Sequence, residues 1–304
     1  MRQPNGSTAP TCSVVIATRD RPQRLASCLE SLAAQDYPRE RFEVIVVDDG
    51  GDSQLDQMTR RYRQRLELSI LRRRFAGRSA ARNQGVAQAC GQLVAFTDDD
   101  SEPDPGWLRA LATRHAAVPG HALGGSTVSM SATNPYARIS GLILDLAYRH
   151  QSGRLPRGAR FFAANNLALP ADRFRMLGGF NPQLRVSEDR ELCDRWVEHG
   201  FGMTFVPEAV IRHATPTTLG DFCRKQFGYG RGAFAYQGAR WRRGLGLSGF
   251  DSSFYRGPVR ESMREVVAQR DPRGLALLIA WQALTAAGFA WEAALAPWRG
   301  GRPS

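Results

Sequence analysis

The chain is short of lysine and of paired cysteines. Lys225 is the one lysine among 304 residues, so nearly all of the positive charge is arginine. The five cysteines form no Cys-x-x-Cys pair and their number is odd, which disfavours a disulfide framework and a zinc ribbon. We therefore expect a reducing compartment, in which Cys28, Cys90 and Cys193 are small core residues.

Sequence repeats, low-complexity tracts and a signal sequence are also missing. The first residues lack the basic start and apolar run of a secretory signal, so we expect none and treat 1–11 as a flexible N-terminus. Hydrophobic residues make up 42% and charged residues 23%, which excludes a disordered tail, a collagen and a polytopic membrane protein. The length suffices for an enzyme-sized core, either in one large domain or in one domain with an appendage.

The first hundred residues alternate between two kinds of pattern. Short apolar runs rich in β-branched residues are typical of buried parallel strands, and the segments between them place apolar residues at helical spacing. This alternation predicts an α/β fold with a mostly parallel sheet and helices on both faces. The expected strands are 12–18, 42–51, 66–71 and 92–100, and the expected helices are 21–35, 53–65 and 79–89.

The second half of the chain is less regular. Segments 122–130 and 161–169 resemble strands, which predicts that the sheet is mixed. A helix is expected over 188–199, with Gly200 as its stop signal, and a short strand over 203–207. A composition shift divides the chain into a main domain, 12–235, and an appendage, 236–304, that begins with a linker or an irregular subdomain over 236–272.

Acidic residues follow two of the predicted strands. Asp48-Asp49 and Asp98-Asp99-Asp100 end the second and fourth strands, and Thr18-Arg19 ends the first. Ligands of open α/β sheets bind beyond the carboxyl ends of the strands. Adjacent carboxylates repel each other unless a cation or a donor satisfies them, and such oxygen ligands suit Mg²⁺ or Mn²⁺ together with phosphate. The alternative is that these acids only cap the following helices.

Two basic positions and one histidine accompany these acids. Arg78 and Arg82 open a predicted helix, where guanidinium groups favour an anion site, although a solvated basic face would give the same pattern. His213 follows an apolar segment, and a histidine in that position is most often structural.

Glu188 and Asp189 begin the helix predicted over 188–199. Both could simply complement the helix dipole, with Ser187 as the cap. On a helical wheel, however, Asp189 projects near the middle of the apolar stripe that contains Leu192 and Trp196, whereas Glu188 lies about 110° away. We therefore expect Asp189 to point inward, as a general base would, and Glu188 to be peripheral.

Six segments in order resemble the family 2 glycosyltransferases. They are VVIATRDRPQRLASCLESLAAQDYP with FEVIVVDDGG, GRSAARNQG, QLVAFTDDD, NNLAL with LGGF, SEDRELCDRW, and a histidine followed by QFGYGRG. The resemblance covers about residues 12–232. It implies the GT-A fold, a Rossmann-like mixed sheet flanked by helices, over the domain 12–235. It also implies an inverting, metal-dependent enzyme that uses a nucleotide-diphosphate sugar.

The resemblance also implies roles for individual residues. Asp189 would be the catalytic base, and Asp98 and Asp100 would form the DxD pair, with Asp100 nearest a Mg²⁺ or Mn²⁺ ion that His213 completes. The extra acid Asp99 could shift that assignment by one. The nucleotide-sugar site would contain Thr18, Arg19, Asp48, Asp49, Arg78, Arg82, Asp98 and Asp99, and the acceptor side would contain Asn166, Glu188, Trp196 and Arg231.

Three further expectations concern the substrate and two competing functions. The QxxRW motif of processive synthases is absent, because Gln226 precedes Phe-Gly-Tyr-Gly-Arg, so one or a few sugars would be added. A sugar-nucleotide nucleotidyltransferase would normally carry a Gly-rich, lysine-containing loop after the first strand, where TRDRPQR stands instead. The net charge of +12 would suit a nucleic-acid-binding protein, but no such motif is present, so no nucleic acid is expected.

The appendage suggests a membrane surface as a partner. Residues 220–273 hold eleven basic and five acidic residues with interleaved aromatics, and an apolar run over 274–290 follows. Such a segment suits an anionic bilayer, as a single span or as an interfacial helix, and a helix packed on the protein or in a dimer is the alternative. We expect a cytoplasmic enzyme on the inner face of the cell membrane, with a glycan or lipid-linked acceptor for cell-envelope or exopolysaccharide glycans.

Overall fold

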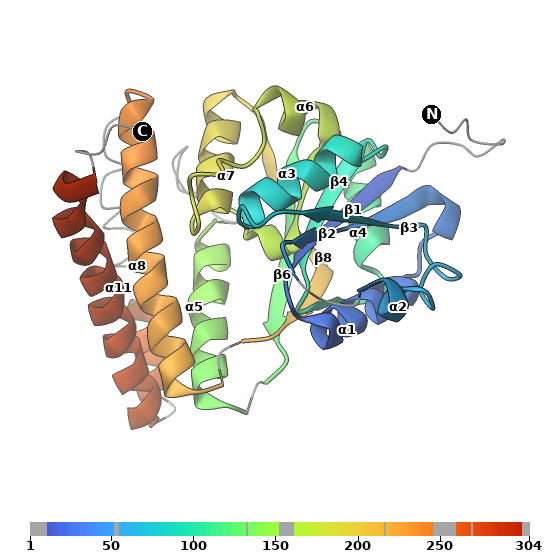
Figure 1. Cartoon of the computed structure of the whole chain (residues 1–304). Helices are drawn as coiled ribbons and strands as arrows, with labels where there is room; N and C mark the ends of the chain where they lie inside the picture. Colours follow the sequence, from blue (N-terminus) through green and yellow to red (C-terminus); the bar gives the residue numbers. More distant parts are fainter. Residues whose placement is uncertain are drawn as a thin grey trace. The chain divides into compact units, whose positions relative to one another are not determined.

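The computed structural model describes most of the chain and divides it into two compact units (Figure 1). The first unit comprises Met1–Val128, Phe162–Pro182 and Arg195–His213, and the second comprises Ser129–Phe161, Gln183–Asp194 and Ala214–Ser304. The predicted flexible N-terminus, apart from Thr11, and residues 246–259 of the predicted linker lie outside the described residues. The described ranges are 11–51, 55–131, 133–151, 161–215, 217–245, 260–268 and 270–299.

The first unit is built on one mixed sheet, which has eight strands within the described residues, in the order β3-β2-β1-β4-β7-β6-β8-β5. β1 pairs in parallel with β2 and β4, and β2 with β3, which confirms the predicted parallel half. β7 is antiparallel to β4 and β6, and β5 to β8, so the sheet is mixed as expected. The strands are β1 Cys12–Thr18, β2 Phe42–Asp49, β3 Leu68–Arg73, β4 Leu93–Asp98, β5 Ser101–Pro103, β6 Ala122–Ser129, β7 Leu167–Pro170 and β8 Met203–His213.

Helices cover both faces of this sheet, which is why its central strands are continuously apolar. Val14 and Val44 belong to a buried cluster with side chains of α1, α2 and α4. On the other face α3 approaches β1 so closely that a Cβ at Gly85 would collide with Val15. The helices of this unit are α1 Pro22–Ala33, α2 Leu55–Thr59, α3 Arg78–Gln88, α4 Trp107–Ala117 and α6 Ala171–Met176, with 3₁₀ turns η1 Arg39–Arg41 and η2 Ala164–Asn166.

Three local expectations for the first unit are wrong. The helix expected over 53–65 is only the short α2, followed by turns, in a segment with few apolar residues. The strand expected over 203–207 continues to His213, because β8 finds a pairing partner in β5. Cys90 is exposed rather than part of the core, because the extended backbone of Ala89 ends α3 just before it.

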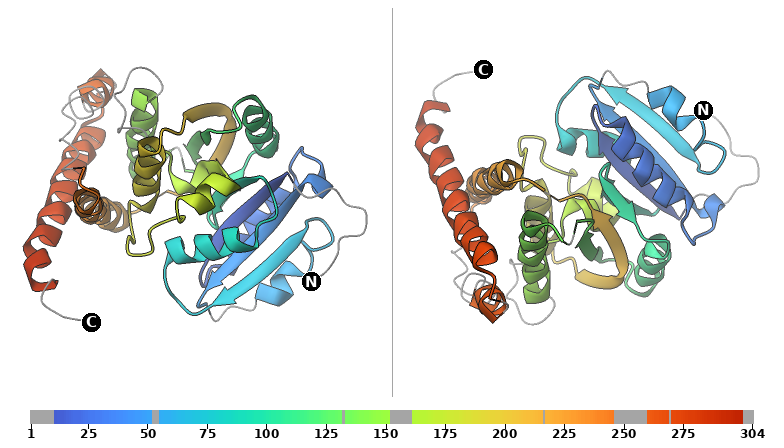
Figure 2. Two further views of the ribbon diagram at one scale, coloured as in Figure 1. Left: turned by 90° about the horizontal axis from the view of Figure 1, so that it is seen from above. Right: turned by 90° about the horizontal axis from the view of Figure 1, so that it is seen from below.

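The second unit is helical. It contains α5 Pro135–Gln151, α8 Leu219–Arg242, α10 Arg260–Ala268, α11 Pro272–Arg299 and the start of α7 Glu188–Glu198. Ile139, Phe222, Val266 and Leu278 form the centre of its core. Figure 2 shows α11 alongside α8. The chain does not become irregular at 236 as expected, because α8 continues through that position to Arg242 and α10 is also helical.

Candidate functional site

The carboxyl ends of β1, β2 and β4 bring the predicted polar residues to one edge of the sheet. In the parallel register Thr18 lies beside Asp48, and Ala17 lies beside Asp98. β1 lies between β2 and β4, so the strand order reverses here, and ligands of open α/β sheets bind at such a point. The expectation that Thr18, Asp48 and the Asp98–Asp100 run share one edge is confirmed.

Asp49 and Asp48 shape the backbone around this edge. The Asp49 carboxylate accepts hydrogen bonds from the backbone N–H groups of Ala76 (2.9 Å) and Gly77 (2.8 Å) and thereby fixes the turn before α3. Asp48 Oδ1 accepts the N–H of Gly51 at 2.9 Å. Burial raises the pKa of Asp48 above its ordinary value, against the lowering effect of that hydrogen bond. The two acids therefore fix the conformation of the loops after β2 and before α3 through hydrogen bonds to the backbone, and both are almost fully buried.

An aromatic side chain that the sequence patterns did not single out lies beside these loops. Phe75 is 53% exposed, and the guanidinium of Arg19 lies 4.2 Å from its ring centre. Gly50 has a positive φ of 79°, and a Cβ there would lie 2.6 Å from the backbone nitrogen of Phe75. The turn therefore requires glycine, and it presents a flat ring at the site. An apolar aromatic inside the basic run RRRFAGR was the available signal.

Arg82 forms an ion pair with Asp98. The Arg82 side chain is 1% exposed, and its Nη2 donates to Asp98 Oδ1 at 2.6 Å. Burial by itself would raise the pKa of Asp98, but the charges of Arg82, Arg78 and His213 lower it to about 2. Asp98 is thus a carboxylate engaged by a buried guanidinium, which makes it a poorer direct metal ligand than expected. Arg78 is exposed one turn earlier on α3.

Asp99 turns back toward the first strand. Thr18 Oγ1 donates to Asp99 Oδ2 at 2.8 Å, and Arg21 Nη1 lies 3.3 Å from Asp99 Oδ1. Burial raises the pKa of Asp99 to about 6, although the Thr18 hydrogen bond lowers it. Arg21 and Arg24 also reach Asp100, at 3.5 and 3.1 Å. These two arginines were not predicted as site residues, although both follow the first strand directly.

Asp100 and His213 meet because β5 pairs with β8. Their register places Ser101 opposite His213, and His213 Nδ1 lies 3.1 Å from Ser101 Oγ and 3.3 Å from Asp100 Oδ1. Among the described residues no group of three or more His, Cys, Asp or Glu side chains is arranged to hold a metal. A carboxylate and an imidazole nevertheless fit Mg²⁺ or Mn²⁺ when diphosphate oxygens supply further ligands.

The residues expected on the acceptor side have different surroundings. Asn166 is buried, accepts from Trp107 Nε1 (2.9 Å) and donates to the carbonyls of Ser126 (2.8 Å) and Ala209 (3.0 Å), so we assign it to support of the sheet. Trp196 is fully buried and donates to the Gly202 carbonyl at 2.8 Å, so we assign it to the core. Arg231, in the second unit, pairs with Glu292 at 2.5 Å.

Glu188 and Asp189 belong to the second unit, and their burial is the reverse of the helical-wheel expectation. Glu188 is 5% exposed, whereas Asp189 is only partly buried and its Oδ1 accepts the Arg190 N–H at 2.8 Å. The wheel assumed one apolar face, but α7 has a second buried face, where Glu191 pairs with Arg243, and Asp194 with Arg240 and Arg243. Glu188 is one turn from Glu191 and shares that face.

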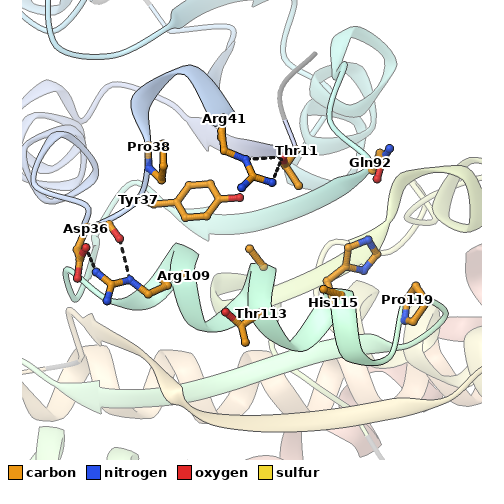
Figure 3. A pocket seen from close by; sticks show the side chains of 12 residues that line it. Thr11, Asp36, Tyr37, Pro38, Arg41, Gln92, Arg109, Thr113, His115 and Pro119 are labelled. Atoms are coloured by element: carbon orange, nitrogen blue, oxygen red, sulfur yellow. Dashed lines mark hydrogen bonds and ion pairs between the residues drawn. The ribbon is translucent and has the colours of Figure 1, made fainter. Parts of the chain in front are cut away.

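A cavity of about 820 Å³ lies at the opposite edge of the sheet (Figure 3). Its lining includes Thr11, Arg41 and Gln92, which directly precede β1, β2 and β4. Arg41 donates to Thr11 Oγ1 at 3.2 and 3.1 Å, and Arg109 pairs with Asp36, so the charged groups are satisfied by protein partners. The cavity contains none of the predicted site residues, and we place the chemistry at the carboxyl edge.

Comparisons with known proteins identify the family of the chain. Residues 13–176 match the family described as Glycosyl transferase family 2. The chain is 26% identical over 230 residues to the glycosyltransferase AglE of Haloferax volcanii, covering 74% of each chain. It is 30% identical over 240 residues to the pre-mycofactocin glycosyltransferase of Mycobacterium tuberculosis, and this match covers 76% of the chain but about half, 48%, of that relative.

Solved structures share the fold. The mannosyltransferase PcManGT of Pyrobaculum calidifontis, solved with GDP-Man and Mn²⁺, matches with a TM-score of 0.60 at 21% identity, over 98% of this chain and 84% of its own. TarS residues 1–349 from S. aureus match with a TM-score of 0.53 at 17% identity, over 96% and 92%. The predicted GT-A fold is confirmed, and the nucleotidyltransferase and nucleic-acid-binding alternatives are not favoured. The chain belongs to glycosyl transferase family 2.

Proposed function

We propose that the chain transfers one or a few sugars, with inversion, from a nucleotide-diphosphate donor to a hydroxyl group of a glycan or lipid-linked acceptor. The observation that carries this proposal is the convergence of Thr18, Asp48 and the Asp98–Asp100 run at the strand-order reversal. Family membership supplies the reaction class.

The donor site is assigned to the first unit. Asp48, Asp49 and Thr18 fix the loops that surround the nucleotide, with the Phe75 ring and Arg19 exposed beside them. Arg78 is the exposed guanidinium on α3 and would face the donor's negative charge, whereas Arg82 keeps Asp98 ionised. The Thr18 hydroxyl donates a hydrogen bond to Asp99, so the DxD segment is positioned before any donor binds.

A Mg²⁺ or Mn²⁺ ion would be held by Asp100 and His213, whose donor atoms lie 3.3 Å apart. When bound, such an ion stabilises the charge that develops on the diphosphate leaving group. Asp98, engaged by Arg82, would support this site by its charge rather than by direct ligation. The Mn²⁺ in the mannosyltransferase structure is consistent with this assignment.

Asp189 is the proposed general base. It would take the proton of the acceptor hydroxyl while that oxygen forms a bond to the anomeric carbon and the bond to the diphosphate breaks, which inverts the anomeric configuration. Its place in the first turn of α7 and its incomplete burial suit a group that must meet substrate. Glu188, beside it but buried, is assigned a positioning role.

Charge supports the proposed acceptor and the proposed location. A net charge of +12 and a basic helical unit suit acceptors at an anionic surface, so we place the enzyme in the cytoplasm at the inner face of the cell membrane, acting on envelope or exopolysaccharide glycans. Arg231 remains a candidate acceptor-side residue, although Glu292 pairs with it.

Thermal-shift measurements on the full chain test the donor assignment. UDP, GDP, dTDP and CMP would each be added with and without Mn²⁺, and the cognate nucleotide should raise Tm more with the ion present, because a ligand of the native state stabilises it. Asp100→Asn should remove the increment that depends on Mn²⁺, while the exposed Asp56→Asn, paired only with Arg72 on the surface, should keep it. Tm values that no nucleotide changes would refute the proposal.

A further inference from the structure

Helix α11 buries Leu277, Leu278 and Trp281 in the core of the second unit, but the side chains that it exposes between Ala276 and Ala296 are also apolar. Every exposed residue between Ala276 and Ala296 is alanine except Ile279, Phe289 and Trp291. Phe289 packs against Phe234 of α8, and we call the rest of this set the apolar face. Glu292 is 8% exposed on the opposite side, where the buried side-chain atoms Gln282 Nε2 and Thr285 Oγ1 also lie. A helix of a water-soluble surface has the reverse arrangement.

Packing against α8 fixes this orientation. The two helices run in the same direction, because Phe222 packs with Leu278 near their starts and Phe234 lies 5.3 Å from Phe289 further along. A Cβ at Gly230 would collide with the Thr285 carbonyl, so the backbones approach closely. Arg231 holds Glu292 at 2.5 Å across the same contact. Rotation of the apolar face toward α8 would break this partly buried ion pair.

Aromatic and basic side chains border the apolar face. Phe227 lies 6.5 Å from Trp291, and Phe234 and Trp241 follow at seven-residue spacing on the same side of α8, with Trp241 68% exposed. Arg270 and Arg273 are exposed at the start of α11, and Arg242 is exposed at the end of α8. α8 itself carries five basic residues and one acid. Aromatic rings beside a basic rim match the chemistry of an anionic headgroup layer.

We propose that the apolar face binds an anionic lipid bilayer, with α11 lying in the plane of the membrane. The inference rests on the proposed function, because it names the surface at which a lipid-linked or envelope acceptor would be met.

The helix α11 meets the length and composition of a span over Pro272–Ala296, but a span would carry Arg231, Glu292 and the basic α8 into hydrocarbon. Only 28% of its apolar window is buried in the protein, so it is not a core helix. The basic rim favours lipid over a second copy of this chain, because two identical basic rims would repel each other.

Vesicle flotation of the full-length protein tests this proposal. The probes are vesicles of phosphatidylglycerol and phosphatidylcholine in equal parts and vesicles of phosphatidylcholine alone. The wild type should float with the anionic vesicles at low salt and leave them in alkaline carbonate. Ile279→Glu and Ala283→Glu change exposed positions and keep good helix formers, and each should weaken binding about tenfold or more. Met176→Glu, at a 62% exposed position on α6, is the matched control and should bind like the wild type.

The outcomes separate the alternatives. Protein that stays on vesicles after carbonate extraction would overturn the in-plane arrangement. Failure of the wild type to bind either vesicle would overturn the proposal, as would light scattering that shows a dimer which Ile279→Glu converts to monomers. The nucleotide-dependent rise in Tm is measured on the same samples. A normal rise without vesicle binding refutes this inference alone, whereas vesicle binding without any rise refutes the proposed function.

Discussion

Replacement of Arg82 by methionine tests whether the donor edge depends on a buried ion pair. Arg82 is 1% exposed and Asp98 19% exposed, and the donor and acceptor atoms are 2.6 Å apart. Arg82→Met fills the same space but leaves the Asp98 carboxylate without its strongest partner. Removal of one partner from a buried pair destabilises by about 3–5 kcal/mol. Because Asp98 retains some contact with water, we expect the lower end, about 3 kcal/mol.

Replacement of Asp98, the other partner, tests the same ion pair. Asp98→Asn removes a counter-ion from the more deeply buried charge, Arg82, so its loss of stability should be at least as large. The double variant removes both charges of the pair. Its loss of unfolding free energy should therefore be smaller than the sum of the two single losses by about 1 kcal/mol or more. Exposed Arg78→Met, one turn away on the same helix, should change stability by less than about 0.5 kcal/mol.

Hydrogen exchange of the β1 and β4 amides is the suitable assay, because it reports on the first unit alone, and urea denaturation gives the free energy of the whole chain. Losses that add exactly in the double variant, or an Arg82→Met protein as stable as Arg78→Met, would show that the pair is not coupled. The neutralising role assigned to Arg82 would then be wrong.

Three further predictions concern the substrates. Asp189→Asn should fold and bind the donor normally but lose about 10²–10⁴-fold in turnover, as removal of a general base does, and steady-state kinetics with near-normal kcat would exclude Asp189. His213→Ala should weaken the Mn²⁺-dependent rise in Tm with nucleotide while leaving nucleotide binding without Mn²⁺ intact, and an unchanged increment would remove it from the metal site. Phe75→Ala should raise the Kd for nucleotide about tenfold through lost stacking, while Phe75→Tyr should not, and equal titration curves for both would leave Phe75 without a role in binding.

The parallel half of the sheet was predictable because buried parallel strands leave a local pattern in the sequence. β1, β2 and β4 are apolar runs covered on both faces, and the acids that end two of them share an edge whenever the strands are parallel. Phe75, Arg21 and Arg24 were not predicted, because their positions depend on turns held by Gly50 and on ion pairs with acids far along the chain. No periodic pattern records such contacts.

Buried polar residues were misjudged for a related reason. Asn166 and Trp196 match the family motifs, but both are buried. Asn166 donates hydrogen bonds to the carbonyls of Ser126 and Ala209, and Trp196 donates one to the carbonyl of Gly202. Hydropathy also treats every acid as exposed, so the wheel for α7 gave the helix one buried face. The structure buries Glu191 and Asp194 as well, because Arg240 and Arg243 satisfy them. Their partners lie about fifty residues further along the chain, beyond any local pattern.

The same ion pairs connect the proposed base with the proposed membrane surface. On one side, α8 holds the first turns of α7, which carry Asp189, through Arg240 and Arg243. On the other side it packs along α11, whose exposed apolar residues form the proposed membrane surface. The proposed base and the proposed membrane surface therefore both depend on α8, whereas the groups assigned to the donor lie on strands of the sheet, on α3 and on the loops between them. A lipid-linked acceptor would account for this division, because α8 would then both orient the proposed base and support the proposed bilayer-facing surface.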